Sequence, residues 1–195
     1  MAGGNLSPRQ KMINLMYLIF ISMLALNMSK EVLSAFGLMN EKFVESNTAA
    51  SARNLAFMEG LDAKVEEQPA KYRPLKAQAD QIEQLASNFN NYIIDLKSQM
   101  VSGLEDDKDY ETMDKGDFLD EYFFIGDKLK PEGKEFVNQM NTFREGVTSA
   151  LASNPDMAAI IDDVNKKFNT DPVENRDGIE VDWLEYNYKH FPLIA

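Results

Sequence analysis

The sequence predicts an all-α protein with a single N-terminal transmembrane helix, followed by an antiparallel helical bundle outside the cytoplasm. Three observations predict this fold class. Residues 12–29 contain no Asp, Glu, His, Lys or Arg. In the rest of the chain, apolar residues recur at steps of three and four, the helical period. The charge is also uneven, because residues 1–30 carry three basic and no acidic residues, whereas residues 31–195 carry 17 basic and 32 acidic residues, a net of −15.

The predicted transmembrane helix covers residues 12–33. The uncharged run from Met12 to Ser29 would span roughly 27 Å as a helix, close to the thickness of the hydrocarbon core of a bilayer. Lys30 can extend its ammonium to the interface, so the apolar residues that follow can lengthen the span. Two alternatives remain: a cleaved signal peptide, disfavoured because there is no Ala-x-Ala site, and a buried helix of a soluble protein.

The charges around this helix predict its orientation. Arg9 and Lys11 precede it, while Lys30 is followed at once by Glu31. Positive flanking charge stays on the cytoplasmic side, so residues 1–11 are expected to form a cytoplasmic tail and residues 34–195 the domain on the other side. Lys11 and Lys30 are therefore topology signals, and from the residues alone Arg9 is most simply another.

One face of the predicted helix combines small and polar side chains. Such residues allow close approach and hydrogen bonding between helices, so this face is a candidate packing surface, although a plain anchor also tolerates them. Its members are Asn14, Ser22, Ala25 and Ser29. Proton movement across a membrane normally needs an ionisable relay, and between Met12 and Ser29 there is no Asp, Glu, His, Lys or Arg. Another subunit would have to supply the carboxylate, and Arg9 is the charge best placed to pair with it.

The remaining elements are predicted in order as helices over residues 31–68, 74–102, 131–154 and 156–168. Pro74 and Pro131 suit the first turn of a helix, and Gly103 suits a helix end. The acidic and then aromatic stretch over residues 105–128 predicts an irregular loop packed on the bundle. Asp182 can cap a last helical segment, WLEYNYKHF.

Composition and motifs exclude several classes of function. The net charge of −12 argues against a nucleic-acid partner, and the absence of cysteine removes thiolate metal sites and thiol catalysis. No calcium loop, P-loop, G-x-S-x-G or H-E-x-x-H motif is present. The single histidine, His190, is expected to be a packing or surface residue. We therefore predict no catalytic, cofactor-binding or metal site, and no enzyme.

The run SPRQKMINLMYLIFISMLALNMSKEVLSAFGLMNEKF, residues 7–43, closely resembles the start of the GldM family, called PorM in non-gliding relatives. The closing GIEVDWLEYNYKHFPLIA resembles the end of that family's first periplasmic domain. The resemblance implies an inner-membrane subunit of the type IX secretion system, with residues 34–195 in the periplasm. Family members continue into further periplasmic domains that reach an outer-membrane secretion ring, so the chain looks like the N-terminal part.

The resemblance also implies a mechanism. The transmembrane helix would pair as a dimer inside a ring of GldL-like two-span subunits, which carry the proton-exchanging glutamate. This motor would use the proton-motive force to power type IX secretion and gliding motility, and would transmit mechanical motion across the periplasm. Arg9 would match the arginine that pairs with the ring glutamate, and Tyr17 a polar contact within the ring.

A second function class stays open. The chain could be a signal-anchored periplasmic sensor or adaptor, in which the helical domain binds a ligand or partner and the transmembrane helix is only a tether. The two classes differ over Arg9, because a tether tolerates its replacement when Lys11 preserves the topology, whereas a motor needs the specific charge.

Overall fold

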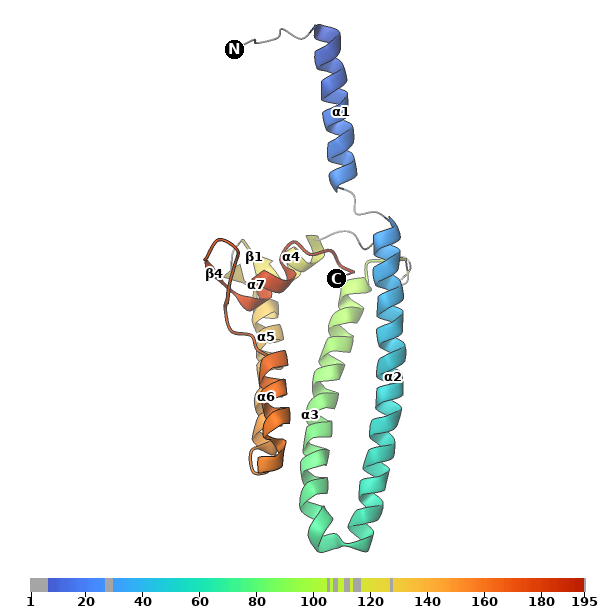
Figure 1. Cartoon of the computed structure of the whole chain (residues 1–195), viewed down its shortest axis with the longest axis vertical. Coiled ribbons are helices and arrows are strands. Elements are labelled where there is room, and N and C mark those ends of the chain that lie inside the picture. Colours follow the sequence, from blue (N-terminus) through green and yellow to red (C-terminus); the bar gives the residue numbers. More distant parts are fainter. Residues whose placement is uncertain are drawn as a thin grey trace.

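The computed structural model describes residues 7–26, 30–104, 106, 109–110, 113, 117–126 and 128–194 (Figure 1). The fold is mostly helical, as predicted, with two small antiparallel strand pairs in addition. The elements in chain order are α1 (Pro8–Leu26), α2 (Lys30–Glu67), α3 (Pro69–Val101), α4 (Asp117–Phe123), β1 (Phe124–Ile125), β2 (Lys128–Leu129), α5 (Pro131–Leu151), the 3-10 helix η2 (Pro155–Met157), α6 (Ala158–Lys167), β3 (Val173–Glu174), β4 (Glu180–Val181) and α7 (Trp183–Tyr188).

Helices α2 and α3 form a long antiparallel hairpin with a very short connection (Figure 1). Gln68 alone separates them, and its carbonyl accepts the N–H groups of Lys71 and Tyr72 at 3.1 and 3.2 Å. Pro69 opens α3, so the predicted start at Pro74 was five residues late. Pro74 fits inside the helix because it lies near the N-terminus, where its missing N–H removes only one helical hydrogen bond.

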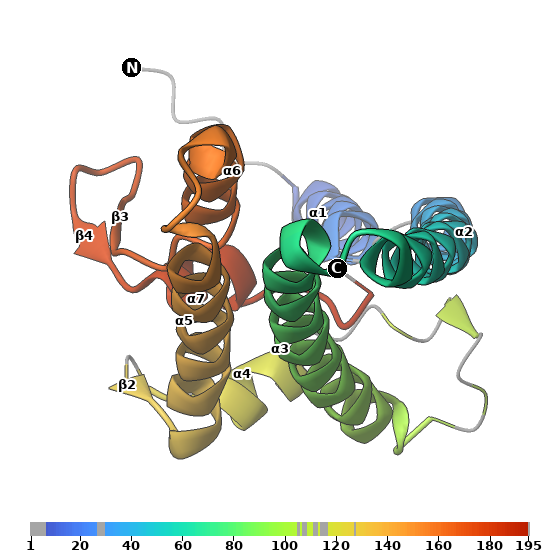
Figure 2. The same cartoon turned by 90° about the horizontal axis from the view of Figure 1, so that it is seen from below.

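The main helices pack as a row. Helix α2 packs on α3, α3 on α5, and α5 on α6. The end-on view shows α2, α3 and α5 side by side, with α6 against α5 (Figure 2). The predicted antiparallel helical packing is therefore present, but in an open row in which α2 occupies one edge.

The core lies where α4 and α7 cover neighbouring ends of α3 and α5 (Figure 1). Its fully buried centre includes Phe123 of α4 and Leu184 of α7, and the ring centroids of Phe123 and Phe136 are 5.5 Å apart. Asp182 caps α7, as predicted, by accepting the N–H of Leu184 at 3.0 Å. A side chain at Gly133 would place its Cβ 2.8 Å from the carbonyl oxygen of Phe123, so glycine permits the close approach of α5 and α4.

The prediction of one transmembrane helix over residues 12–33 is not supported. No helix in the described parts of the chain is both long enough and apolar enough to cross a membrane. Helix α1 ends at Leu26 and α2 begins at Lys30, and residues 27–29 lie outside the described residues. The first turns of α1 also contain polar residues, Arg9, Gln10 and Lys11.

Tyr92 of α3 generates a pH prediction. Burial raises the pKa of its phenol to about 12, with smaller contributions from Tyr122 and Glu135. The unfolded phenol ionises near pH 10, so between about pH 10 and 12 the folded state retains a proton that the unfolded state loses. The free energy of unfolding should therefore fall as pH rises through this window. Tyr188 has a pKa raised by burial and acts in the same direction.

Urea unfolding at several pH values between 8 and 12 measures this effect. Tyr92→Phe removes the ionisable hydroxyl and should make the loss of stability above pH 10 shallower, with the same m-value. An unchanged pH dependence in Tyr92→Phe would contradict the assignment.

Candidate functional site

Helix α1 exposes its apolar side chains on all sides. Nine large apolar side chains between Met12 and Ile21 are exposed, from 37% at Ile13 to 68% at Met12. Four of them line a shallow apolar groove along one side of the helix: Ile13, Met16, Tyr17 and Phe20. An exposed apolar surface of this extent is typical of a segment that is covered by a partner or a membrane.

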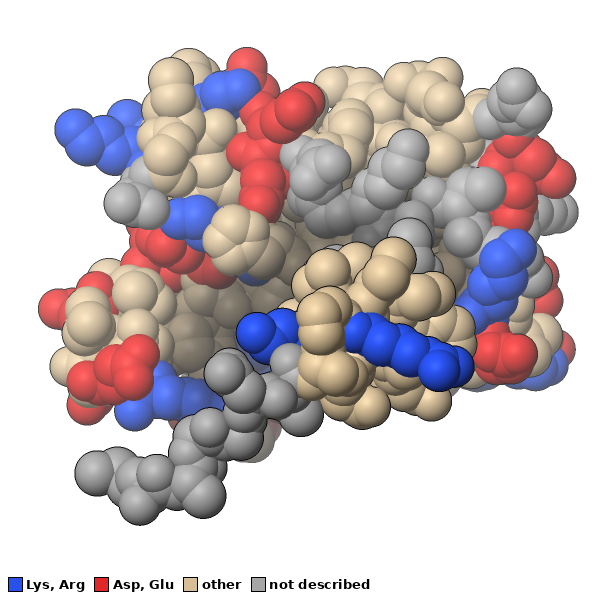
Figure 3. Space-filling view, turned by 90° about the horizontal axis from the view of Figure 1, so that it is seen from above, with Lys and Arg blue, Asp and Glu red and all other residues tan. Residues whose placement is uncertain are grey.

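Arg9 and Lys11 lie in the first turn of α1, and both are exposed. Ser7 precedes this turn, and its hydroxyl accepts the N–H of Gln10 at 3.3 Å, which fixes the start of the helix. Viewed from the α1 end, basic side chains cross the exposed tip of the molecule, and acidic side chains are spread over the domain around it (Figure 3).

The predicted packing face is only partly described. Asn14 and Ser22 are exposed on α1, and the Asn14 side chain accepts a hydrogen bond from Gln10 at 3.3 Å. Ala25 lies in α1, but its side chain is not among the described ones, and Ser29 lies outside the described residues. Lys30 is the first residue of α2. The structure thus places Arg9, Tyr17, Asn14 and Ser22 on one exposed helix without joining them into a pocket.

Helix α2 carries a second exposed apolar surface, which the sequence analysis did not single out. Its members follow one another at steps of four, three and four residues: Val32, Phe36, Met39 and Phe43. We call these four residues the α2 stripe. Leu33 and Gly37 on the neighbouring face are buried, so the first turns of α2 are apolar on two sides. The spacing of the stripe is that of the seam between two paired helices.

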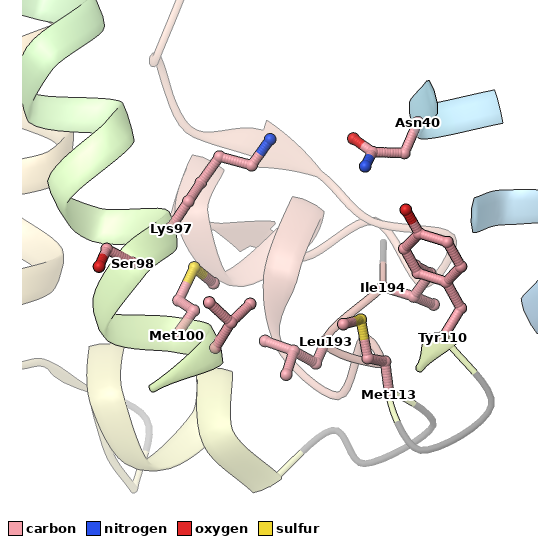
Figure 4. Close-up of a pocket in the computed structure, with 9 residues that line it drawn as sticks. Asn40, Lys97, Ser98, Met100, Tyr110, Met113, Leu193 and Ile194 are labelled. Carbon is pink, nitrogen blue, oxygen red and sulfur yellow. The ribbon is translucent and has the colours of Figure 1, made fainter. Parts of the chain in front are cut away.

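A cavity of about 260 Å³ lies between α2, the end of α3 and the C-terminal segment, residues 191–194. In Figure 4, Lys97 extends from α3 toward Asn40, and Tyr110 lies close to Asn40. Met100 and Met113 form part of the apolar lining. The cavity therefore combines the hydrogen-bond donors of Asn40, Lys97 and Tyr110 with an apolar lining. The lining residues do not form a nucleophile–base pair.

His190 has a partner that the sequence did not indicate. The residue lies two positions beyond the end of α7 and has a left-handed conformation, φ 64°. Its backbone N–H donates to Asp120 Oδ1 at 2.8 Å, and its Nδ1 lies 2.6 Å from Asp120 Oδ2. The ring itself is 77% exposed. One carboxylate of α4 therefore fixes the point at which the chain leaves α7, which agrees with a surface role for His190.

Across the described residues, no group of three or more His, Cys, Asp and Glu side chains is arranged to hold a metal ion. Asp106 and Asp109 of the acidic stretch are described, and both make interactions of their own. The arrangement that stands out is exposed apolar helix surface, which suits binding to other helices.

A family model described as the GldM N-terminal domain matches residues 31–195. The match begins at the second residue of α2 and includes α3, the aromatic core and α7, whereas α1 precedes it. A search of curated proteins finds no match.

The Asp120 contact generates a prediction. Asp120→Ala removes both acceptors from His190 and should lower the free energy of unfolding by about 1 kcal/mol, the usual net value of a partly buried hydrogen bond. Hydrogen exchange at the His190 amide should accelerate. Asp163→Ala is the control, since the Lys167–Asp163 pair at 2.8 Å is exposed and should contribute little. Equal effects of the two substitutions would contradict the special role of Asp120.

Proposed function

Since the chain belongs to the GldM family, a structural component of the gliding-motility and type IX secretion motor, we propose that it is the helical shaft of that motor. In this role α1 lies in the inner membrane among partner helices, with its N-terminus on the cytoplasmic side and α2–α7 in the periplasm. The proton-motive force drives the motor, and the shaft transmits the mechanical motion into the periplasm to power secretion and gliding.

The observation that carries this proposal is the exposed apolar surface that covers α1 and reappears on α2 as the α2 stripe. An apolar helix of this kind is stable in an aqueous cell only when another surface covers it. A simple tether needs an apolar helix but no apolar stripe beyond it. The stripe therefore favours a protein that also pairs outside the membrane.

The proposed ring partner is a GldL-like two-span membrane protein that supplies the proton-carrying glutamate. Residues 12–29 contain no Asp, Glu, His, Lys or Arg, so this segment offers none of the side chains that usually relay protons near neutral pH. Arg9, exposed in the first turn of α1, is placed to pair with a ring carboxylate and to lower its pKa while unpaired carboxylates exchange protons. Tyr17, two turns further along α1, is proposed as a contact within the ring. One charge that crosses about 100 mV supplies roughly 2.3 kcal/mol.

We propose that a second copy of the chain covers the α2 stripe. In the sequence, three of the predicted packing residues precede the stripe at the same helical spacing. Ser22, Ala25, Ser29 and Val32 follow one another at steps of three, four and three residues. A parallel pair in one register would bring each face against its own copy. The small residues would allow close approach in the membrane, and the larger ones would fill the interface beyond it.

Helix α2 has the dimensions of a transmission element. Its 38 residues correspond to roughly 57 Å at 1.5 Å per residue. Pro residues, which would kink it, are absent from this helix. A rotation or tilt at its N-terminal end would therefore be transmitted along the helix to the α2–α3 connection, because no flexible linker interrupts the helix.

Co-purification in mild detergent with native mass spectrometry tests the proposal. A complex of two copies of this chain with several copies of a two-span, glutamate-bearing protein would support it. Recovery of the chain alone, with chemical cross-linking in cells giving the same result, would refute it in favour of a tethered sensor or adaptor.

Arg9 generates the first prediction of the proposal. Arg9→Ala should abolish gliding and type IX secretion while the chain remains in the membrane, and Arg9→Lys should retain only part of the activity, because an ammonium cannot reproduce the bidentate guanidinium pair. Lys11→Ala is the control and should remain active, since Arg9 still provides flanking positive charge. Full activity of Arg9→Ala would reduce Arg9 to a topology signal.

The α2 stripe generates the second prediction of the proposal. Met39→Asp places a charge on the stripe and should reduce dimer recovery at least tenfold in native mass spectrometry. Leu38→Asp is the matched control, because Leu38 is an equally exposed apolar neighbour that points away from the stripe. If both variants dimerise as the parent does, the stripe is not the interface.

A further inference from the structure

Helix α2 packs on α3 along the hairpin, but its buried residues are confined to one place. Of its 38 residues, Leu33 and Gly37 are the buried ones, and they lie one turn apart near the N-terminal end. At the other end, Lys76 of α3 pairs with Asp62 at 3.1 Å, but the Asp62 carboxylate is largely exposed, so this pair contributes little. The firm attachment of α2 to the domain is therefore in its first turns.

The attachment at Gly37 is made by a tyrosine ring from the opposite side of the domain. The Cγ, Cδ2 and Cε2 atoms of Tyr110 occupy the space where a Cβ on residue 37 would lie. The ring therefore rests directly on the helix backbone, which only glycine allows. By contrast, a Cβ at Gly60, further along the same helix, would meet nothing within 4 Å.

Tyr110 is joined to the C-terminal segment by a short chain of contacts. The carbonyl of Tyr110 accepts the N–H of Met113 at 3.1 Å, so the two residues belong to one turn. Met113 is 4% exposed, and its carbonyl accepts the N–H of Ile194 at 3.3 Å. Tyr110, Met113 and Ile194 also line the cavity of Figure 4, on the side where α2 contributes Asn40.

The other end of the C-terminal segment is fixed to the domain. His190, which precedes it, is held by the Asp120 carboxylate of α4. The C-terminal segment is therefore held at two points. At one end His190 contacts Asp120 of α4, and at the other the Ile194 N–H donates to the carbonyl of Met113, a residue that is itself hydrogen-bonded to Tyr110.

We propose that Tyr110 in the Gly37 notch is the coupling contact through which α2 moves the C-terminal segment. A rotation of α2 carries the Gly37 notch sideways and pushes the ring, which rests against the helix backbone there. The Tyr110–Met113 turn then shifts Ile194 relative to His190. Tyr110 is thus a positioning residue of the shaft, and this role rests on the proposed function.

A double-mutant cycle in the full chain tests the contact without reference to the motor. Gly37→Ala should lower Tm by several degrees, because its Cβ displaces the ring. In the Tyr110→Ala background the same substitution should have no further effect. Gly60→Ala, the same change in open space on the same helix, should leave Tm unchanged or slightly raised. Additive effects of Gly37→Ala and Tyr110→Ala would overturn the contact.

Hydrogen exchange separates coupling from general loss of stability. Tyr110→Ala and Gly37→Ala should accelerate exchange at the Ile194 amide at least tenfold and leave the Val147 amide in α5 unchanged. Tyr110→Phe should behave as the parent, because the contact uses ring carbons and not the hydroxyl. Unchanged exchange at Ile194, or equal acceleration at both amides, would overturn the proposal.

Cells carrying Tyr110→Ala complete the test. Gliding and type IX secretion should fall markedly at normal levels of the assembled complex, and Tyr110→Phe and Gly60→Ala should be active. Normal motility and secretion in Tyr110→Ala cells would overturn the coupling role and leave the proposed shaft function intact. The shaft function itself fails on a different result, the recovery of the chain without any membrane partner.

Discussion

The exposed apolar surface of α1 and of the first turns of α2 is the constraint on which the rest of the structure depends. The free-energy cost of exposing apolar surface to water grows with the exposed area. In the described part of the chain, no element covers α1 or the α2 stripe. The domain therefore has two kinds of apolar surface: one that it buries itself, around Phe123, Phe136 and Leu184, and one that requires another molecule. The open row of helices agrees with this division, because α2 lies at one edge of the row and its stripe stays accessible to the partner that we propose.

The division also explains where the domain is rigid. Aromatic rings from α4, α5 and α7 interlock at the end of the row that lies beside the start of α2 (Figure 1). The α2–α3 hairpin extends away from this core and ends in exposed ion pairs. A force applied at the N-terminus of α2 therefore meets the best-packed part of the domain first, where Leu33 is 1% exposed and Gly37 carries the ring of Tyr110.

Local signals in the sequence predicted most helices and little of the contacts between them. Pro131 marks the start of α5, Asp182 caps α7, and the helical period of apolar residues identified α2, because each signal acts within a few residues.

The start of α3 was placed at Pro74 instead of Pro69, since either proline suits a first turn. Helix α4 was missed inside an acidic stretch, because tertiary packing of Leu119 and Phe123 decides its conformation. His190 and Asp120 are 70 residues apart, and no local pattern could have paired them. For the candidate site, the apolar character of α1 follows from its sequence, whereas the exposure of the α2 stripe could not be predicted, because periodicity shows that a face is apolar without showing what covers it. The roles of Arg9 and Tyr17 rest on the family resemblance and stay predictions.

The chemistry of the chain limits what it can contribute to a motor. Proton transfer within a membrane normally uses Asp, Glu, His, Lys or Arg, and residues 12–29 contain none of these. What the chain does provide is geometry: a long helix without proline, an apolar surface that continues beyond α1, and a glycine notch that holds one ring against the helix backbone. Each of these features transmits or constrains motion, and none converts energy. In the proton-driven assembly that we propose, the titrating carboxylate would belong to partner subunits, and this chain would determine how their work reaches the periplasm.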